Sequence, residues 1–162
     1  DAVNIGQALQ VLAKKAGIYG MIGGQVVDVK CTGQSISGDT LDFIYRLKTG
    51  ALIESSMMIG AILAGASKEE IEIVETIAQK VGLAFQIQDD ILDVTSTAEV
   101  LGKPIHSDEK NEKTTYVTWK GIEAAKAEVK QLSEEAVKEL KRLESTDEYL
   151  ELLLESLIYR KK

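Results

Sequence analysis

Apolar residues recur every three or four positions along almost the whole chain, and stretches that alternate apolar and polar residues are rare. This periodicity is typical of amphipathic helices rather than strands. Ser67 with Glu70, and Ser145 with Glu148, have the spacing of capping boxes, which mark helix starts. The pattern predicts helices over residues 4–16, 18–29, 40–64 with an interruption near Thr49 and Gly50, 67–94, 114–120, 122–143 and from about 145 towards the C-terminus. The sequence therefore predicts an all-α protein.

One long stretch, from Ser96 to Lys113, lacks helical periodicity. Loops of this length in compact domains are often functional. Neither an internal repeat nor a shift in composition divides the chain. We therefore expect residues 1–162 to form a single domain.

The composition narrows the possible partners. A formal net charge of -7 argues against nucleic acid or an anionic membrane as the main partner. The single cysteine, Cys31, allows no internal disulfide, which is usual in a reducing compartment. The longest uncharged apolar run, Met57 to Ala66, is too short to span a bilayer, and no signal peptide is visible. These features predict a cytoplasmic protein that is not integral to a membrane.

Three aspartates, Asp89, Asp90 and Asp93, stand close together in the predicted helix 67–94, just before the long stretch without helical periodicity. On a helical wheel they share an arc of about 100° with Gln86 and Thr97, opposite an apolar side. One interpretation is that the acids form the solvated stripe of an amphipathic helix.

Two observations favour a metal site instead. No Lys or Arg lies between Lys80 and Lys103 to pair with the acids, although surface helices usually provide such partners. The apolar side also covers about half of the wheel, as expected for a deeply packed helix. Oxygen donors without His or Cys suit Mg²⁺, which typically binds one or two carboxylates together with water and phosphate oxygens. The pattern therefore indicates Mg²⁺ that carries a phosphorylated ligand.

Three lysines flank the acidic helix in irregular segments. Lys48 lies in RLKTG, Lys103 in LGKP and Lys113 in DEKNEKTTY. Lysine binds phosphate oxygens as a point charge. Each lysine alone is typical of a solvated surface, but their grouping around the acids favours phosphate binding.

Five segments in a fixed order carry a family resemblance. They are GMIGGQVVD at 20–28, RLKTGALI at 46–53, GLAFQIQDDILDV at 82–94, LGKP at 101–104, and a loop from Asp108 to Lys113 that ends in KTTY. With these segments the chain resembles the trans-isoprenyl diphosphate synthases, specifically the C-terminal part of a bacterial farnesyl diphosphate synthase (geranyltranstransferase). The resemblance covers essentially the whole chain. It implies the C-terminal half of an isoprenoid-synthase-type helical bundle and a homodimer.

The resemblance also implies catalytic roles. Asp89, Asp90 and Asp93 would ligate Mg²⁺ or orient its waters. Lys48 and Lys103 would grip the diphosphate of the allylic substrate, and with Asp89 they would form the catalytic set.

Further substrate contacts are implied in the same way. Thr49 and Gln86 would line the allylic site, and Lys113 would complete its basic rim. Gln25 and Asp28 would support the metal site from a facing helix. A basic C-terminus that closes over the second diphosphate would be formed by Arg160, Lys161 and Lys162.

The implied reaction joins isopentenyl diphosphate to dimethylallyl or geranyl diphosphate. The allylic C–O bond ionises, the isopentenyl double bond attacks the carbocation, and a proton is lost to the released diphosphate. Apolar helices would shield the cation from water. No protein nucleophile is required.

Three alternatives stay open. The protein could make geranylgeranyl or longer polyprenyl diphosphates, or it could be a non-catalytic regulatory subunit with the same fold. It could also be a helical interaction domain whose acids are merely solvated. The intact set of aspartates and lysines argues against the regulatory subunit.

The first aspartate-rich motif of the family, and the arginines that follow it, have no counterpart in this chain. The resemblance therefore implies an N-terminally truncated chain that exposes apolar surface, including parts of MMIGAILAGA, unless it self-associates. One aspartate cluster cannot complete the metal set of the family. We therefore expect no synthase turnover from the isolated 162-residue chain. A steady-state assay, with upstream residues excluded by intact mass, tests this, and turnover would refute it.

Overall fold

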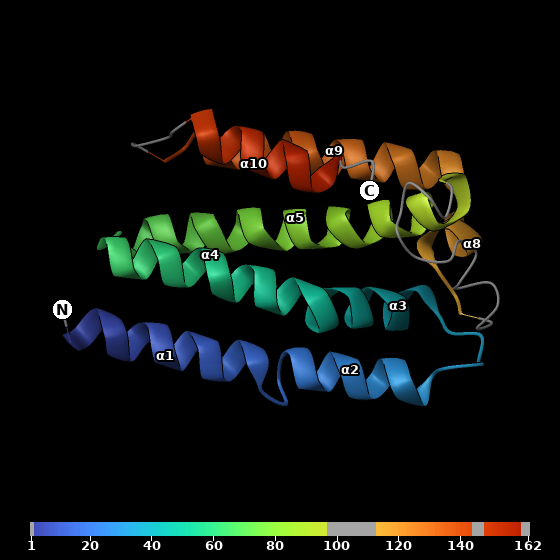
Figure 1. Ribbon diagram of the computed structural model, residues 1–162, viewed down its shortest axis with the longest axis horizontal. Helices are drawn as coiled ribbons and strands as arrows, with labels where there is room; N and C mark the ends of the chain where they lie inside the picture. Colours follow the sequence, from blue (N-terminus) through green and yellow to red (C-terminus); the bar gives the residue numbers. More distant parts are fainter. Residues whose placement is uncertain (1, 97–112, 144–147, 160–162) are drawn as a thin grey trace.

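The computed structural model describes residues 2–96, 113–143 and 148–159, and all regular structure among them is helical (Figure 1). The elements are α1 (Ala2–Ala16), α2 (Met21–Lys30), α3 (Gly38–Tyr45), η1 (Arg46–Gly50), α4 (Ala51–Ala64), α5 (Lys68–Thr95), α8 (Tyr116–Lys120), α9 (Ile122–Leu140) and α10 (Glu148–Ile158). The predicted all-α class is confirmed, and the predicted helix positions agree within a few residues.

Helix α5, with 28 residues, lies in the middle of the bundle (Figure 1). Helices α9 and α10 pack on one side of it, and α4 packs on the other. Helices α1 and α2 form an outer layer against α4 and η1. One stripe of α5 is completely buried and forms the centre of the core, with Ile77, Val81, Ala84 and Ile87. The burial of this stripe explains why the apolar side of α5 is so wide.

Local signals place the ends of the helices around α5. Ser67 and Glu70 form the predicted capping box, in which each side chain accepts a hydrogen bond from the other residue's backbone N–H. Hydrogen bonds to the Glu70 carboxyl from the Ser67 backbone N–H, and to a smaller extent from the Ser67 side chain, lower the pKa of that carboxyl. Helix α4 ends at Gly65, whose φ of 83° is the left-handed conformation that glycine adopts readily. The second predicted capping box cannot be compared, because Ser145 lies outside the described residues.

The predicted interruption near Thr49 and Gly50 is confirmed as a change in helix type, although the helix does not break there. The chain instead makes a π-helical turn, η1, within one continuous helix from Gly38 to Ala64. Helix α5 packs closely against this turn at two glycines: a Cβ on Gly82 of α5 would lie 2.9 Å from the Cα of Gly50. Single π turns inside α-helices are frequent at functional sites.

The continuous helix from Gly38 to Ala64 is longer than the apolar run that the sequence analysis compared with the thickness of a bilayer. Gly38–Ala64 has 27 residues and, in the described part of the chain, is the one helix long and apolar enough to cross a membrane. Length and composition alone are weak support for a membrane span, because the core helix of a soluble protein passes the same test. Here its residues Leu41, Ile44, Ala51 and Ile62 are buried against the rest of the bundle.

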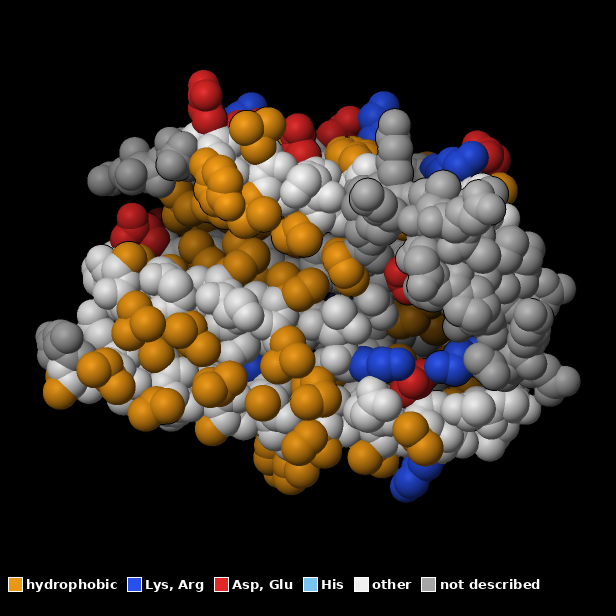
Figure 2. All heavy atoms as spheres, in the orientation of Figure 1, with side chains coloured by type: hydrophobic (Ala, Val, Ile, Leu, Met, Phe, Trp, Pro, Cys, Tyr) orange, Lys and Arg blue, Asp and Glu red, His pale blue; other side chains and the backbone are white. Residues whose placement is uncertain are grey.

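Exposed apolar side chains gather on α1, α2 and the turn between them (Figure 2). This surface, the α1–α2 apolar face, consists of Val3, Ile5, Leu9, Leu12, Ile18, Tyr19, Ile22, Val26 and Val29. In the segment MMIGAILAGA, Leu63 is exposed as expected, but Met58 and Ile62 are buried. Groups of exposed apolar side chains of this kind are typical of interaction surfaces.

An ion-pair cluster ties α1 to the two helices beneath it. The Lys15 ammonium donates hydrogen bonds to Glu54 of α4 and to Glu75 of α5, the latter at 2.8 Å. Glu54 is only 7% exposed. Burial alone would lower the pKa of Lys15, but the bonds and the attraction from the two carboxylates outweigh it and raise the pKa above its ordinary value of 10.5. The cluster therefore stabilises the position of α1.

We expect Lys15→Met to lower the free energy of unfolding by about 3 kcal/mol at pH 7, because Glu54 would stay buried without its cation. The folded-state pKa of Lys15 is raised, so its contribution is complete below pH 10.5 and is lost as the pH rises through the folded-state pKa. Urea unfolding at neutral pH measures the effect.

Lys68→Met is the matched control, because Lys68 is exposed and lies 3.7 Å from Glu72. This variant should change the unfolding free energy by less than about 0.5 kcal/mol. Equal losses in the two variants would contradict the structural importance of the Lys15 cluster.

Candidate functional site

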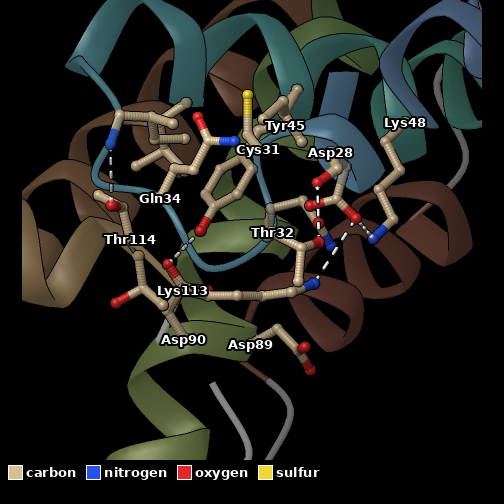
Figure 3. A pocket seen from close by; sticks show the side chains of 15 residues that line it. Asp28, Cys31, Thr32, Gln34, Tyr45, Lys48, Asp89, Asp90, Lys113 and Thr114 are labelled. Atoms are coloured by element: carbon tan, nitrogen blue, oxygen red, sulfur yellow. Dashed lines mark hydrogen bonds and ion pairs between the residues drawn. The ribbon is translucent and has the colours of Figure 1, made fainter. Parts of the chain in front are cut away.

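A polar cavity of about 120 Å³ lies where α2, α3, η1, α5 and residues 113–115 meet (Figure 3). Residues to which the sequence assigned catalytic or substrate-binding roles line it: Lys48, Gln86, Asp89, Asp90 and Lys113. Asp28 also lines it. These residues come from segments far apart in the chain, and the fold brings them around one space.

Asp28 is the counterion of both lysines in this cavity. Its Oδ2 lies 2.7 Å from Nζ of Lys48 and 3.6 Å from Nζ of Lys113, and the two ammonium groups converge on it (Figure 3). Each of the three side chains is partly shielded from solvent. The two cations share this one carboxylate, but Asp89 and Asp90 line the same cavity, so carboxylates outnumber ammonium groups there.

A close approach of α2 to the π turn makes this cluster possible. A Cβ on Gly24 would lie 2.4 Å from the backbone nitrogen of Lys48, so only glycine fits there. Asp28 follows four residues later on the same face of α2. Gln25, which the resemblance paired with Asp28, is exposed and is not among the residues that line the cavity.

The three aspartates have different surroundings. Asp89 is half-buried at the cavity, whereas Asp90 and Asp93 are buried, with Asp93 only 3% exposed. Asp93 is not among the residues that line the cavity. The alternative of a solvated acidic stripe is therefore wrong for Asp90 and Asp93.

Asp90 is held by groups from two other elements. Its Oδ2 accepts a hydrogen bond from the Tyr45 hydroxyl at 2.5 Å and another from the backbone N–H of Tyr116 at 2.7 Å. The donors come from α3 and from the start of α8. Sequence reasoning missed Tyr45, because nothing in a single sequence marks a tyrosine before RLKTG as a partner of a distant acid.

Helix α8 follows the cavity-lining residues 113–115 and carries two aromatic side chains and a lysine that contact one another. The Lys120 ammonium donates to the Tyr116 hydroxyl at 2.6 Å and lies over the rings of Tyr116 and Trp119. Burial raises the pKa of the Tyr116 hydroxyl, although the bond from Lys120 opposes that shift. The bond to Tyr116 raises the pKa of Lys120. Both groups therefore keep their protons at neutral pH.

The donor set fits Mg²⁺ only together with a ligand. Among the described residues, no group of three His, Cys, Asp or Glu side chains is arranged to hold a metal. Mg²⁺ commonly uses one or two carboxylates and fills its remaining positions with water and phosphate oxygens. Asp89, an oxygen donor at the edge of a cavity that also contains two lysines, meets that requirement.

A second cavity of about 530 Å³ lies between α4 and α10 and is mostly apolar. Thr49, expected in the allylic site, lines this cavity rather than the polar one. Lys48 lines both cavities, so they lie side by side at the π turn. The apolar part of the wall of the second cavity is formed by Leu52, Ile53, Met57, Leu150, Leu153, Leu154 and Leu157.

Some of the expected site residues lie outside the described residues. Lys103 belongs to the stretch 97–112, and Arg160, Lys161 and Lys162 follow the last described position. Their expected roles in diphosphate binding stay predictions.

The helical architecture is that of the isoprenoid synthases. The chain belongs to the polyprenyl synthetase family, whose sequence model matches residues 3–153. This confirms the family and the fold that the resemblance implied.

Two curated relatives illustrate the match. The chain is 46% identical over 139 residues to a chloroplastic geranylgeranyl pyrophosphate synthase of Capsicum annuum, covering 85% of this chain and 38% of that protein. It is 39% identical over 155 residues to a farnesyl diphosphate synthase of Escherichia coli, covering 93% of this chain and 52% of that protein. The chain thus spans about half the length of these relatives or less. Because a geranylfarnesyl diphosphate synthase also matches, the relatives define the class and not the product length.

A solved structure of a related enzyme also matches this chain. The crystal structure of a geranyltransferase from Helicobacter pylori, complexed with magnesium and isoprenyl diphosphate, matches with a TM-score of 0.81 at 31% identity. The match covers 98% of this chain and 52% of that one.

Proposed function

We propose that this chain supplies the diphosphate-binding half of a trans-prenyl diphosphate synthase. The observation that carries the proposal is the meeting of Lys48, Lys113 and Asp89 around one polar cavity. The family membership and the magnesium and isoprenyl diphosphate bound to the Helicobacter pylori protein support it.

The two lysines bind the diphosphate of the allylic substrate. Their ammonium groups already share one carboxylate oxygen of Asp28, so their positive charge is only partly balanced. Phosphate oxygens offer stronger and more numerous acceptors for these ammonium groups. Lys103, which lies outside the described residues, is proposed to add a third cation.

The aspartate-rich motif holds Mg²⁺, with Asp89 as the ligand at the cavity. Asp90 and Asp93 ligate the ion or orient its waters. When bound, Mg²⁺ supplies positive charge that stabilises the departing diphosphate. Gln86, which also lines the cavity, contributes an amide beside the same substrate group.

The apolar cavity beyond Lys48 is proposed to receive the hydrocarbon part of the substrate, with Thr49 at its entrance. An allylic carbocation forms when the C–O bond breaks, and water would destroy it. Leucine, isoleucine and methionine side chains exclude water from that position. Isopentenyl diphosphate then forms the new C–C bond, and the released diphosphate accepts the proton.

Farnesyl diphosphate is the product that we propose, because the Escherichia coli farnesyl diphosphate synthase matches 93% of this chain. Geranylgeranyl diphosphate is the second candidate, favoured by the 46% identity to the Capsicum annuum protein.

We expect the protein to bind inorganic pyrophosphate only in the presence of Mg²⁺, and Asp89→Ala to weaken that binding at least about tenfold, because a metal-ligating carboxylate is lost. Isothermal titration calorimetry with and without Mg²⁺ measures both effects.

Glu72→Ala is the control, because it removes an exposed carboxylate from the far end of the same helix. It should leave binding unchanged. Binding that survives Asp89→Ala intact would favour the helical interaction domain over the synthase.

We also propose that the protein is a homodimer that buries the α1–α2 apolar face. A large, contiguous apolar surface on an outer layer is the form of a protein interface. The face is close to the functional site, because α2 also carries Asp28.

Leu9→Glu should shift the protein from dimer to monomer in light scattering coupled to gel filtration, because it places a charge on the face where Leu9 is 60% exposed. Leu152→Glu on α10 is the matched control, at 62% exposure, and should leave the dimer intact. Dissociation by Leu152→Glu alone would place the contact on α10 instead.

A further inference from the structure

Three elements meet at one carboxylate oxygen beside the polar cavity. Oδ2 of Asp90 accepts a hydrogen bond from the Tyr45 hydroxyl at 2.5 Å and from the Tyr116 backbone N–H at 2.7 Å. Tyr45 is the last residue of α3, and Tyr116 is the first residue of α8. We name this arrangement the Asp90 clasp.

The residues of the clasp are buried. Asp90 and Tyr45 are each 8% exposed, and Tyr116 is 2% exposed. A buried carboxylate is costly unless donors satisfy it, and hydrogen bonds to a charged acceptor are about twice as strong as neutral ones. The Tyr45 hydroxyl thus has a specific task that its aromatic ring alone cannot perform.

Lys113 lies close to the clasp along the chain. Lys113 comes three residues before Tyr116, at the point where the described chain resumes, and its ammonium lies 3.6 Å from Asp28. The residue after it, Thr114, accepts a hydrogen bond from the Ile36 N–H at 3.3 Å. The clasp and this weaker bond both join the start of α8 to residues that line the cavity.

We propose that Tyr45 is a positioning residue for the polar cavity: by holding Asp90 against the start of α8, it fixes Lys113 beside Lys48 and Asp28. The pathway runs from the Tyr45 hydroxyl to Asp90, then to the Tyr116 N–H, and along the backbone to Lys113. The role of this pathway in diphosphate binding rests on the proposed function. Its role in positioning α8 does not.

A double-mutant cycle tests the pathway. The Kd for inorganic pyrophosphate with Mg²⁺ is measured for the unmodified protein, Tyr45→Phe, Lys113→Ala and the double variant. We expect Tyr45→Phe to raise the Kd about fivefold and Lys113→Ala about tenfold. Because Tyr45 acts through Lys113, the double variant should be no weaker than Lys113→Ala alone. A role in general stability would instead multiply the two effects to about fiftyfold.

Tyr116→Phe is the matched control. It removes a buried tyrosine hydroxyl that accepts from Lys120, but it leaves the backbone N–H that binds Asp90. It should not change the Kd by more than about twofold, and its effect should multiply with that of Lys113→Ala. Circular dichroism establishes that each variant is folded.

Hydrogen–deuterium exchange at the Tyr116 amide provides a readout that needs no ligand. Exchange should be at least about tenfold faster in Tyr45→Phe and unchanged in Tyr116→Phe. Failure of the unmodified protein to bind pyrophosphate would overturn the proposed function, and exchange alone would then decide whether Tyr45 positions α8. Unchanged exchange in Tyr45→Phe would overturn the inference. The inference would also be overturned if exchange is faster in Tyr45→Phe but the Kd of the double variant equals the product of the two single effects. The clasp would then hold α8 without positioning Lys113.

Discussion

Helix α5 has to fill the centre of the bundle and also carry carboxylates into its interior. Ile77, Val81 and Ile87 are completely buried on this helix, and Asp90 and Asp93 are buried just beyond them. A buried carboxylate without hydrogen-bond donors would cost several kcal/mol. Asp90 avoids that cost because Tyr45 and the Tyr116 backbone donate to it. These bonds bring the end of α3 and the start of α8 together on α5, next to the polar cavity.

Repulsion between the lysines is a second constraint on the cavity. Two ammonium groups at one site repel each other, and Asp28 reduces this repulsion by lying between Lys48 and Lys113. The lysines are therefore held in place before any ligand arrives. Because Asp89 and Asp90 line the same cavity and the whole chain has a net charge of -7, a diphosphate would need bound Mg²⁺ as well as these two lysines.

Backbone packing decides how closely these groups approach. Gly24 allows α2 to touch the backbone of Lys48, and Gly82 allows α5 to touch Gly50. The π turn lies between these two contacts and presents Lys48 to both the polar and the apolar cavity. A larger residue at Gly24 would move Asp28 away from Lys48, because the two helices could not approach as closely.

Periodicity and capping residues in the sequence determined that the protein is all-α, and Ser67 with Glu70 determined where its central helix begins. The sequence also determined which residue types could bind Mg²⁺ and a diphosphate, because the aspartates and lysines stand in recognisable segments. Tertiary structure alone decided that Asp89 faces the cavity while Asp90 is buried, that Thr49 lines a different cavity from Gln86, and that Tyr45 meets Asp90. Helical spacing specifies the direction of a side chain around its own axis, whereas its partner depends on how neighbouring helices pack, and that information is spread over the whole chain.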